Sequence, residues 1–187
     1  MKLLTGRFPS DTGQDIFYRI WQPEKEPKAV IQIIHGMAEH SERYADFAEF
    51  MCDKGFIVAA NDHPGHGITG YDAGKLMYFD EKEGWIKVSE DLKKFNKQLR
   101  LTYDLPLIIL GHSMGSFFAR YFLIKNPEMA DSWILSGTAD FTLAERIGGF
   151  ALANISLFFK NAEEEAGFIH KIGFKAYNNK FKSEGNE

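Results

Sequence analysis

The stretch from Leu105 to Lys125, LPLIILGHSMGSFFARYFLIK, decides the fold that this sequence predicts. It opens with Leu105–Leu110, a near-continuous apolar run of the length that is typical of a strand buried on both faces of a parallel sheet. It closes with Met114–Lys125, which is apolar on most faces and therefore predicts a buried helix. Asn126-Pro127 ends that helix, because the residue before a proline is driven out of the helical conformation.

The turn between this strand and this helix, Gly111-His112-Ser113-Met114-Gly115, matches the pattern G-x-S-x-G. A serine that attacks a carbonyl carbon must project from a strained turn, and small residues on either side let the strand and the helix approach closely. The helix also brings N–H groups and the positive end of its dipole to the reacting carbon. A plain turn with an exposed serine would show the same five residues. The flanking strand and helix favour Ser113 as a nucleophile.

Other apolar runs predict further strands of the same sheet, at Ala29–Ile34, Gly55–Ala60 and Ser132–Ser136. The segment Asp15–Trp21 is mixed in character and predicts an antiparallel strand at the edge of the sheet. Strands alternate with helical patterns along the chain. This alternation indicates an α/β fold whose mostly parallel sheet is flanked by helices.

Two helical patterns lie between these strands. Residues 44–51 carry apolar side chains at helical spacing, with Ser41 as the expected N-cap and Gly55 as the stop. Residues 85–99 show one apolar stripe on an otherwise charged helix.

The chain is expected to divide near residue 140. Residues 1–140 would form the N-terminal part of the core, and residues 141–187 would begin a helical cap. Large apolar side chains recur at helical spacing in Phe141–Lys160, either as a lid over an acyl chain or as one more core helix. No segment after residue 140 has a strand pattern, so the last strands of the fold are expected to be absent from this chain.

A second candidate element of the site follows the strand Ala29–Ile34, in the run His35-Gly-Met-Ala-Glu-His40. An oxyanion hole needs two backbone donors aimed at the developing negative charge. The residue after the nucleophile, Met114, would give one, and Met37 would give the other, with Gly36 permitting the backbone path. A loop with a satisfied histidine is the alternative. The oxyanion interpretation is favoured, because both loops follow the carboxyl ends of strands, where such folds bind ligands.

Composition excludes several classes of function. Among 187 residues, 22 are basic and 26 acidic, so the net charge is −4, and no basic block predicts a nucleic-acid partner. Cys52 is the only cysteine, which excludes an internal disulfide and a cysteine-based zinc site. The sequence shows neither a secretion signal nor an apolar run long enough to span a membrane, so a cytoplasmic location is expected.

The run Asn61-Asp-His-Pro-Gly-His-Gly67 could suggest a metal site through its two histidines, His63 and His66. The sequence has no HExxH pattern, and a Pro-Gly turn suits tight packing beneath the site better. No metal is therefore expected.

The sequence resembles the monoacylglycerol lipase and lysophospholipase group of the α/β-hydrolases, of the serine aminopeptidase S33 type. Four segments carry the resemblance: His35–Tyr44, Asp62–Gly67, Gly111–Gly115 and, in the expected cap, Gly173–Phe181. The three motifs occur in the order that the group shows, and the similarity covers essentially the whole chain. One small departure is Thr69, where members of the group usually have serine.

This resemblance implies hydrolysis of esters of lipids with one acyl chain, without a cofactor. By position it assigns the nucleophile to Ser113 and the oxyanion donors to Met37 and Met114. It also implies that Glu39 and Arg43 lie near the polar headgroup of the substrate.

The catalytic acid and base are harder to assign. A serine needs a histidine to take its proton, and in this fold the order is Ser, acid, His. His112 neighbours Ser113 on a strained turn and cannot fold back onto it, which leaves His170. Asp131 would lie at the wrong end of the sheet, whereas Asp140 would lie at the right end. A triad Ser113–Asp140–His170 is conceivable, but no strand precedes His170 to fix it.

Members of the group are longer, and their acid and histidine follow two further strands. The resemblance therefore implies a fragment that stops before the acid and base. In that case Ser132–Ser136 would be an unprotected sheet edge, open to aggregation or to self-association. The apolar cap would also allow peripheral contact with a membrane.

Three functions are consistent with these features. The first is a serine ester hydrolase acting on a lipid-like substrate. The second is a peptidase or small-ester hydrolase on the same scaffold, since one fold hosts many chemistries. The third is a binding module that retains the pocket and does not turn over substrate.

Overall fold

The computed structural model describes residues 1–140, 142, 143 and 147. Most of the expected helix over 141–160 and the segment 173–181 lie outside the described residues. The chain forms two compact units, Met1–Ala139 and Asp140–Glu187, and the architecture that follows is that of the first unit.

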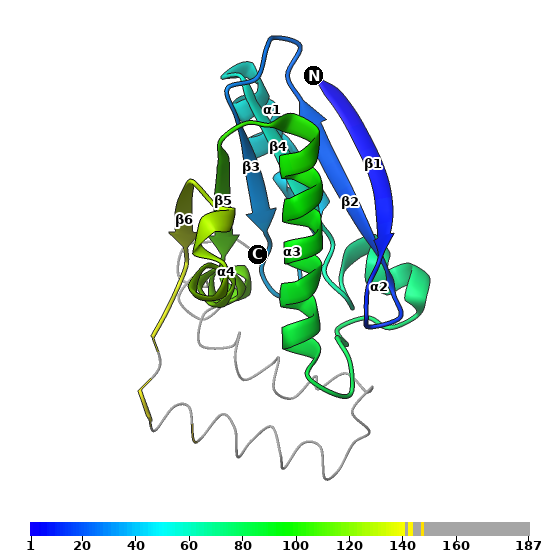
Figure 1. Cartoon of the computed structure of the whole chain (residues 1–187). Helices are drawn as coiled ribbons and strands as arrows, with labels where there is room; N and C mark the ends of the chain where they lie inside the picture. The colour runs from blue at the N-terminus through cyan, green and yellow to red at the C-terminus, as the bar shows by residue number, and fades with distance from the viewer. Residues whose placement is uncertain (141, 144–146, 148–187) are drawn as a thin grey trace, which may run out of the picture. The chain divides into compact units, whose positions relative to one another are not determined.

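A sheet with the strand order β1-β2-β4-β3-β5-β6 runs through this unit (Figure 1). Four of its strands are parallel, namely β3 (Ala29–Ile34), β4 (Phe56–Asn61), β5 (Leu107–His112) and β6 (Ser132–Ser136). The remaining two are antiparallel to their neighbours, β2 (Asp15–Gln22) to β4 and β1 (Lys2–Pro9) to β2. The prediction of an α/β fold with a mostly parallel sheet is confirmed.

The N-terminal hairpin corrects one prediction. The segment Asp15–Trp21 was expected at an edge of the sheet, but β2 lies inside it, between β1 and β4. No strand was predicted over β1. Apolar and polar residues alternate there only in part, because Gly6 and Arg7 interrupt the pattern and a proline ends it. Leu4 and Phe8 nonetheless pack against the core and give β1 its apolar face.

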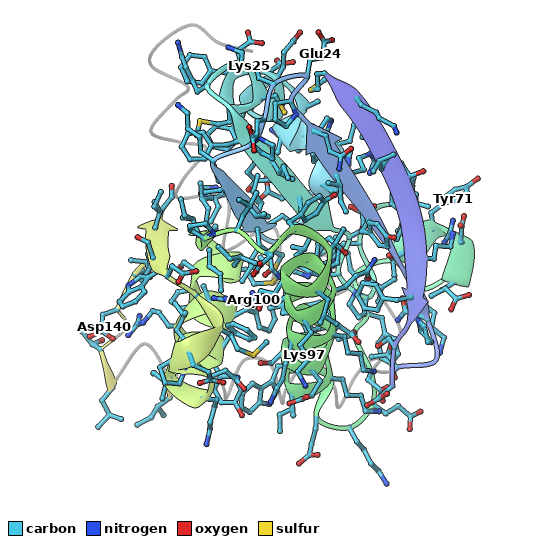
Figure 2. All side chains as sticks on the ribbon, turned by 45° about the horizontal axis from the view of Figure 1, so that its top comes forward. Glu24, Lys25, Tyr71, Lys97, Arg100 and Asp140 are labelled. Atoms are coloured by element: carbon cyan, nitrogen blue, oxygen red, sulfur yellow. The ribbon has the colours of Figure 1, made fainter. Side chains whose placement is uncertain are left out.

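Helices cover both faces of the sheet. In Figure 1, α3 (Gly84–Tyr103) and α4 (Met114–Lys125) lie in front of it, and α1 (Ala45–Asp53) lies behind. Fully buried Phe95 and Phe122 fill the core on the first face, while charged side chains such as Lys97 line the outer face of α3 (Figure 2). None of the helices within the described ranges is long and apolar enough to cross a bilayer.

The expected N-cap at Ser41 is wrong. A 3-10 helix, η1 (Ser41–Tyr44), precedes α1, whose N-cap position is Tyr44 without a side-chain cap. Ser41 instead serves tertiary contacts: its hydroxyl accepts a hydrogen bond from Arg19 at 2.6 Å, and its N–H donates to Asp62 at 2.7 Å. The expected stop at Gly55 agrees with the structure, since α1 ends at Asp53 and Gly55 has φ 85°.

The strand β6 is an edge of the sheet over the described part of the chain, because its recorded partner is β5 alone. Trp133 is 58% exposed and Ile134 is 50% exposed. The predicted sheet edge at Ser132–Ser136 agrees with the described part of the chain.

Two short elements complete the unit, α2 (Gly67–Ala73) and η2 (Pro127–Met129).

One carboxyl group is buried under the turn that joins β1 to β2. Asp91, on α3, is 1% exposed and accepts a hydrogen bond of 2.6 Å from the hydroxyl of Ser10. Burial raises the pKa of Asp91 to about 7, although the bond from Ser10 and the charge of Lys94 act in the opposite direction. The turn continues to Gln14, whose side-chain oxygen accepts the N–H of Gly65 at 3.0 Å.

We expect Asp91 to add stability as the pH falls from 8 to 5. A carboxyl whose pKa is raised on folding binds a proton in the folded state but not in the unfolded state, which favours folding below the folded pKa. Unfolding free energies of wild type and Asp91→Asn, measured by urea titration at several pH values, check this. The unfolding free energy of wild type should exceed that of Asp91→Asn by an amount that grows by about 2–3 kcal/mol from pH 8 to pH 5. A difference that does not depend on pH would contradict it.

Candidate active site

The turn at Ser113 is strained and fixed from both sides. Ser113 is half-buried between β5 and α4 and has φ 51° and ψ −121°, a conformation that is costly for a residue with a side chain. Its N–H donates to the carbonyl of Ser136 at 2.9 Å, and its own carbonyl accepts the N–H and hydroxyl of Ser116 at 2.9 and 2.6 Å. The predicted sharp bend at Ser113 is therefore present.

The two glycines of the G-x-S-x-G pattern stand where backbone segments meet. A Cβ atom on Gly115 would overlap the carbonyl oxygen of Ile34, at the carboxyl end of β3. A Cβ atom on Gly111 would lie 2.7 Å from the carbonyl oxygen of Gly115. Close approach of β3, β5 and the first turn of α4 thus requires glycine at both positions.

The loop after β3 lies against the same turn. A Cβ atom on Gly36 would be 3.1 Å from Cβ of Ser113, so the two residues are neighbours in space. Met37 follows at the start of a turn and is 44% exposed. Met114 is the first residue of α4, and N–H groups of a first helical turn have no acceptor within their helix. The structure therefore brings the two predicted oxyanion segments together beside Ser113.

The carboxylate of Glu39 holds this loop in shape. Its Oε1 accepts hydrogen bonds from the N–H of Gly36 and, at 2.9 Å, from the hydroxyl of Tyr44. Burial, with the nearby charge of Glu39, raises the pKa of the Tyr44 hydroxyl, which stays protonated as the donor. Arg43 is exposed on η1. Its predicted contact with a headgroup stays a prediction, as does that of Glu39.

Asp62 organises the loop after β4 and was not anticipated as a site residue. It is fully buried, and its two carboxylate oxygens accept the N–H groups of Ser41 at 2.7 Å and Ile68 at 2.8 Å. Its backbone carbonyl accepts the hydroxyl of Thr69 at 2.9 Å, and that hydroxyl in turn accepts the N–H of Phe17. Threonine thus supplies the oxygen that serine would supply at this position.

Three buried histidines pack beneath the loops. The ring of His35 lies 3.9 Å from that of His63 and 5.4 Å from that of His66, measured between centroids. Nε2 of His35 accepts the N–H of His63 at 3.1 Å, so Nδ1 carries the proton and donates to the carbonyl of Gly36 at 2.8 Å. Nε2 of His63 donates to the carbonyl of His35 at 3.2 Å.

These contacts define a structural role for the cluster. They support the expectation that the Asp62–Gly67 run packs tightly beneath the site. Both ring nitrogens of His35 are hydrogen-bonded, as the alternative interpretation of the His35–His40 loop expects, and the oxyanion role of that loop stays a prediction. Over the described ranges, no group of three or more His, Cys, Asp or Glu side chains is arranged to hold a metal ion.

The histidine cluster is held in the neutral state. Burial lowers the pKa of His35 to about 3, helped by the neighbouring His66, and burial also lowers the pKa of His63 and of His66. Neutral rings are needed here, because Nε2 of His35 can accept a hydrogen bond only when it is unprotonated.

The acid and base of a triad are not assembled in the first unit. Asp131 accepts the N–H of Leu107 at 2.8 Å, at the amino end of β5, so it lies at the end of the sheet opposite Ser113, as expected. Asp140 belongs to the second unit, and His170 lies outside the described residues. Nδ1 of His112 contacts the hydroxyl of Ser136 at 3.2 Å. The triad Ser113–Asp140–His170 stays a prediction.

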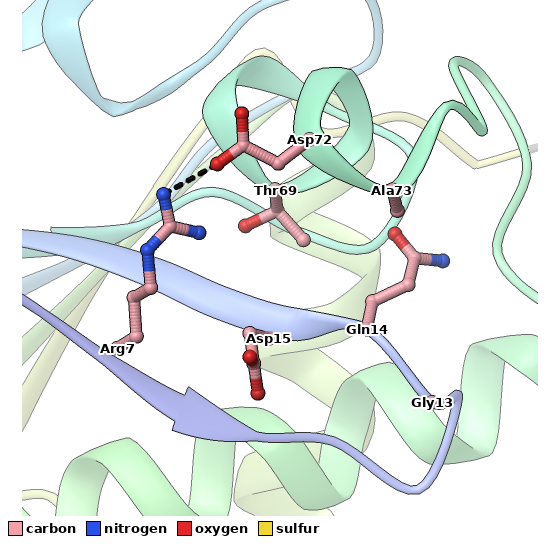
Figure 3. A pocket seen from close by; sticks show the side chains of 7 residues that line it. All are labelled: Arg7, Gly13, Gln14, Asp15, Thr69, Asp72 and Ala73. Carbon is pink, nitrogen blue, oxygen red and sulfur yellow. Dashed lines mark hydrogen bonds and ion pairs between the residues drawn. The ribbon is translucent and has the colours of Figure 1, made fainter.

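A polar cavity of about 450 Å³ lies between the β1–β2 hairpin and α2 (Figure 3). In Figure 3, Arg7 reaches across it to form an ion pair with Asp72. Neither Ser113 nor Met37 lines this cavity, so it is separate from the candidate active site.

We expect the histidines to destabilise the fold as the pH falls from 7 to 5. A base whose pKa is lowered on folding is protonated only in the unfolded state over this range, so folding stability is lost as the pH decreases. His35 alone should cost about 1.4 kcal/mol per pH unit below its unfolded pKa. The test uses the Asp91→Asn background, which removes the opposing effect of Asp91. There the unfolding free energy, measured by urea titration, should fall as the pH decreases. His35→Asn should reduce the slope of unfolding free energy against pH by about 1.4 kcal/mol per pH unit, the effect of one proton. An unchanged slope would contradict the buried neutral state.

Comparisons with known proteins agree with this geometry. A family model described as serine aminopeptidase, S33, matches residues 25–166. The monoglyceride lipase of Homo sapiens is 31% identical over 156 residues, which cover 78% of this chain and 50% of that protein. The monoacylglycerol lipase of Mycolicibacterium smegmatis is 33% identical over 131 residues, covering 68% of this chain and 44% of that protein.

The crystal structure of a thermostable carboxyl esterase from Bacillus coagulans, in complex with glycerol, has a TM-score of 0.79 and 31% identity. The match covers 91% of this chain and 56% of that one. The chain thus spans about half the length of the curated relatives it matches. Its sheet and helices have the α/β-hydrolase fold, and by its sequence this chain belongs to the serine aminopeptidase S33 family.

Proposed function

We propose that this chain is a serine ester hydrolase of lipids with one acyl chain, monoacylglycerol or lysophospholipid, and that Ser113 is its nucleophile. The observation that carries the proposal is the positive φ of Ser113, 51°, at a strand-to-helix turn that abuts the Gly36 loop. A strained serine of this kind projects its hydroxyl above the sheet, where a substrate can reach it. Membership of a hydrolase family supports the assignment.

The reaction would proceed through an acyl-enzyme. Oγ of Ser113 attacks the ester carbonyl carbon and loses its proton to a histidine, and the carbonyl oxygen takes up the negative charge. The N–H groups of Met37 and Met114 hold that oxyanion. The ester C–O bond then breaks, the alcohol leaves with the proton, and water releases the fatty acid from Ser113. Asp140 and His170 remain the in-chain candidates for acid and base.

The oxyanion loop would be set before substrate arrives. The carboxylate of Glu39 accepts the N–H of Gly36, and Nδ1–H of His35 donates to the carbonyl of Gly36. The second bond holds the peptide that carries the Met37 N–H. Donors that need no rearrangement stabilise a transition state most effectively. We place Glu39 and the exposed Arg43 near the headgroup, where the oxygen of Glu39 that does not bind Gly36 could accept a glycerol hydroxyl.

Apolar side chains near Ser113 support a lipid substrate. Met37 is 44% exposed, and Phe117, one helical turn beyond Ser113 on α4, is 37% exposed. The monoglyceride lipase of Homo sapiens and the monoacylglycerol lipase of Mycolicibacterium smegmatis carry names that fit such a substrate. The carboxyl esterase from Bacillus coagulans carries a name that fits ester hydrolysis in general, so a small-ester hydrolase on the same site is the second candidate.

The purified chain should react with a fluorophosphonate probe at Ser113. Labelling should disappear in Ser113→Ala and persist in Ser132→Ala, which removes an exposed hydroxyl on β6. Hydrolysis of long-chain monoacylglycerol should fall by at least about 10³-fold in Ser113→Ala.

The choice of substrate separates the alternatives. Faster cleavage of short than of long p-nitrophenyl esters would favour a small-ester hydrolase, and cleavage of an aminoacyl p-nitroanilide would favour a peptidase. A folded chain that binds monoacylglycerol but leaves the probe unreacted would contradict the enzyme and favour a binding module. Loss of labelling in His170→Ala would identify the base.

A further inference from the structure

The buried carboxyl group of Asp91 is only half satisfied. Its Oδ2 accepts the hydroxyl of Ser10 at 2.6 Å, whereas its buried Oδ1 has no hydrogen-bond donor among the described residues. Nζ of Lys94 lies 3.9 Å from that Oδ1 and makes a closer contact, at 2.8 Å, with Asp11. When Asp91 ionises, its charge therefore depends on the hydroxyl of Ser10, its one hydrogen-bond donor in the described part of the chain.

The charges around Asp91 come from α3 and from the turn between β1 and β2. Glu90 and Lys94 are its neighbours on α3, and Asp11 is on the turn. Burial is the largest influence and raises the pKa of Asp91 to about 7; Ser10 and Lys94 lower this pKa, and Asp11 and Glu90 raise it further. The charge of this carboxyl group therefore changes near neutral pH.

The hydrogen bond between Asp91 and Ser10 holds the whole turn against α3. Its length is typical of a hydroxyl that donates to an ionised carboxylate, about 2.5–2.7 Å, and a bond between neutral groups is weaker. Oγ of Ser10 also accepts the N–H and the hydroxyl of Thr12, at 3.1 and 2.9 Å. The N–H of Ser10 donates to the carbonyl of Gln14 at 3.0 Å and closes the turn. Protonation of Asp91 therefore loosens the attachment of a turn that moves as one piece.

The side chain of Gln14 connects this turn to the loop after β4. Gln14 is 4% exposed, and its Oε1 accepts the N–H of Gly65 at 3.0 Å. Its Nε2 donates to the carbonyls of Tyr78 and Phe79, at 3.5 and 3.4 Å. Gly65 has no free space around it, because a Cβ atom there would lie 2.5 Å from the backbone N of Tyr78. A displacement of Gln14 is therefore passed on to Gly65.

From Gly65 the contacts continue to the loop after β3. A turn closed by a backbone hydrogen bond of 2.9 Å joins Gly65 to His63. The N–H of His63 donates to Nε2 of His35 at 3.1 Å, and Nδ1–H of His35 donates to the carbonyl of Gly36 at 2.8 Å. That carbonyl belongs to the peptide that carries the N–H of Met37. An unbroken series of contacts thus links the carboxyl group on α3 to this amide.

We propose that Asp91 is a positioning residue whose ionisation sets the N–H of Met37 through this series of hydrogen bonds. Ionised Asp91 draws the hydroxyl of Ser10 and its turn toward α3, and protonated Asp91 releases them. The use of the Met37 amide as an oxyanion donor rests on the proposed function, whereas its displacement does not. The device would make the candidate site sensitive to pH through a group outside it.

Backbone amide shifts of the 15N-labelled whole chain, followed by NMR from about pH 5 to about pH 9, test the proposal. The amides of Gly65 and Met37 should share a titration component with a midpoint near pH 7. Asp91→Asn should abolish this component. Asp11→Asn is the matched control, because it removes an exposed carboxylate from the same turn and should leave the component in place. Amides of Gly65 and Met37 without a component that depends on Asp91 would overturn the proposal.

Ser10→Ala distinguishes the hydrogen bonds from the direct electric field of the charge. In this variant the carboxyl 13C resonance of Asp91 should still titrate, with a higher midpoint, because the hydroxyl that lowers its pKa is gone. The component at Gly65 and Met37 should nevertheless be lost. If that component persists while Asp91 titrates, the charge acts through space and the proposed series of contacts is wrong.

Reactivity separates this inference from the proposed function. Wild type should react with a fluorophosphonate probe about tenfold faster than Asp91→Asn at about pH 8 and at about the same rate at pH 5.5, since complete loss of an oxyanion donor costs about 10²–10³-fold. The same ratio at both pH values would overturn the control of the site by Asp91. A chain that is never labelled contradicts the proposed function alone, because the amide shifts require no reaction at Ser113.

Discussion

The structure depends on the contact between the first turn of α4 and the carboxyl end of β3. A side chain at Gly115 would overlap the carbonyl oxygen of Ile34, so the helix can approach only through bare backbone. That approach forces the chain to reverse at Ser113, whose φ of 51° would otherwise be avoided. The surrounding packing offsets this local strain. One backbone contact therefore determines where the serine hydroxyl lies relative to the Gly36–Met37 loop.

A second layer of buried polar groups supports the loops around the serine. The neutral ring of His35 ties the Gly36 carbonyl to the backbone of His63, and the carboxylate of Asp62 ties the loop after β4 to η1. Because these groups are buried, they stabilise the loops only while each is hydrogen-bonded, and His35 can accept its hydrogen bond only in the neutral state. The candidate site therefore rests on a polar network that acid would disrupt before it altered the apolar core.

The sequence allowed the parallel strands, the elbow and the adjacent loop to be predicted, because apolar runs and glycines at fixed offsets are local signals. The ends of β3 and β6 agree with the predicted ends, whereas β5 begins two residues later than expected. The strand β1 and the role of Ser41 were missed, since both depend on partners far away in the chain. No local pattern indicated that Asp62 would bind backbone groups of two segments, because its partners Ser41 and Ile68 come together only in the fold.

A crystal structure of the chain would test the central claim, that backbone packing presents Ser113 to two amide donors. Ser113 should show φ near 51°, and the N–H groups of Met37 and Met114 should converge on one point beside its Oγ, with an oxygen within about 3.1 Å of both nitrogens. A negative φ at Ser113, or a Met37 amide turned away from that point, would contradict it.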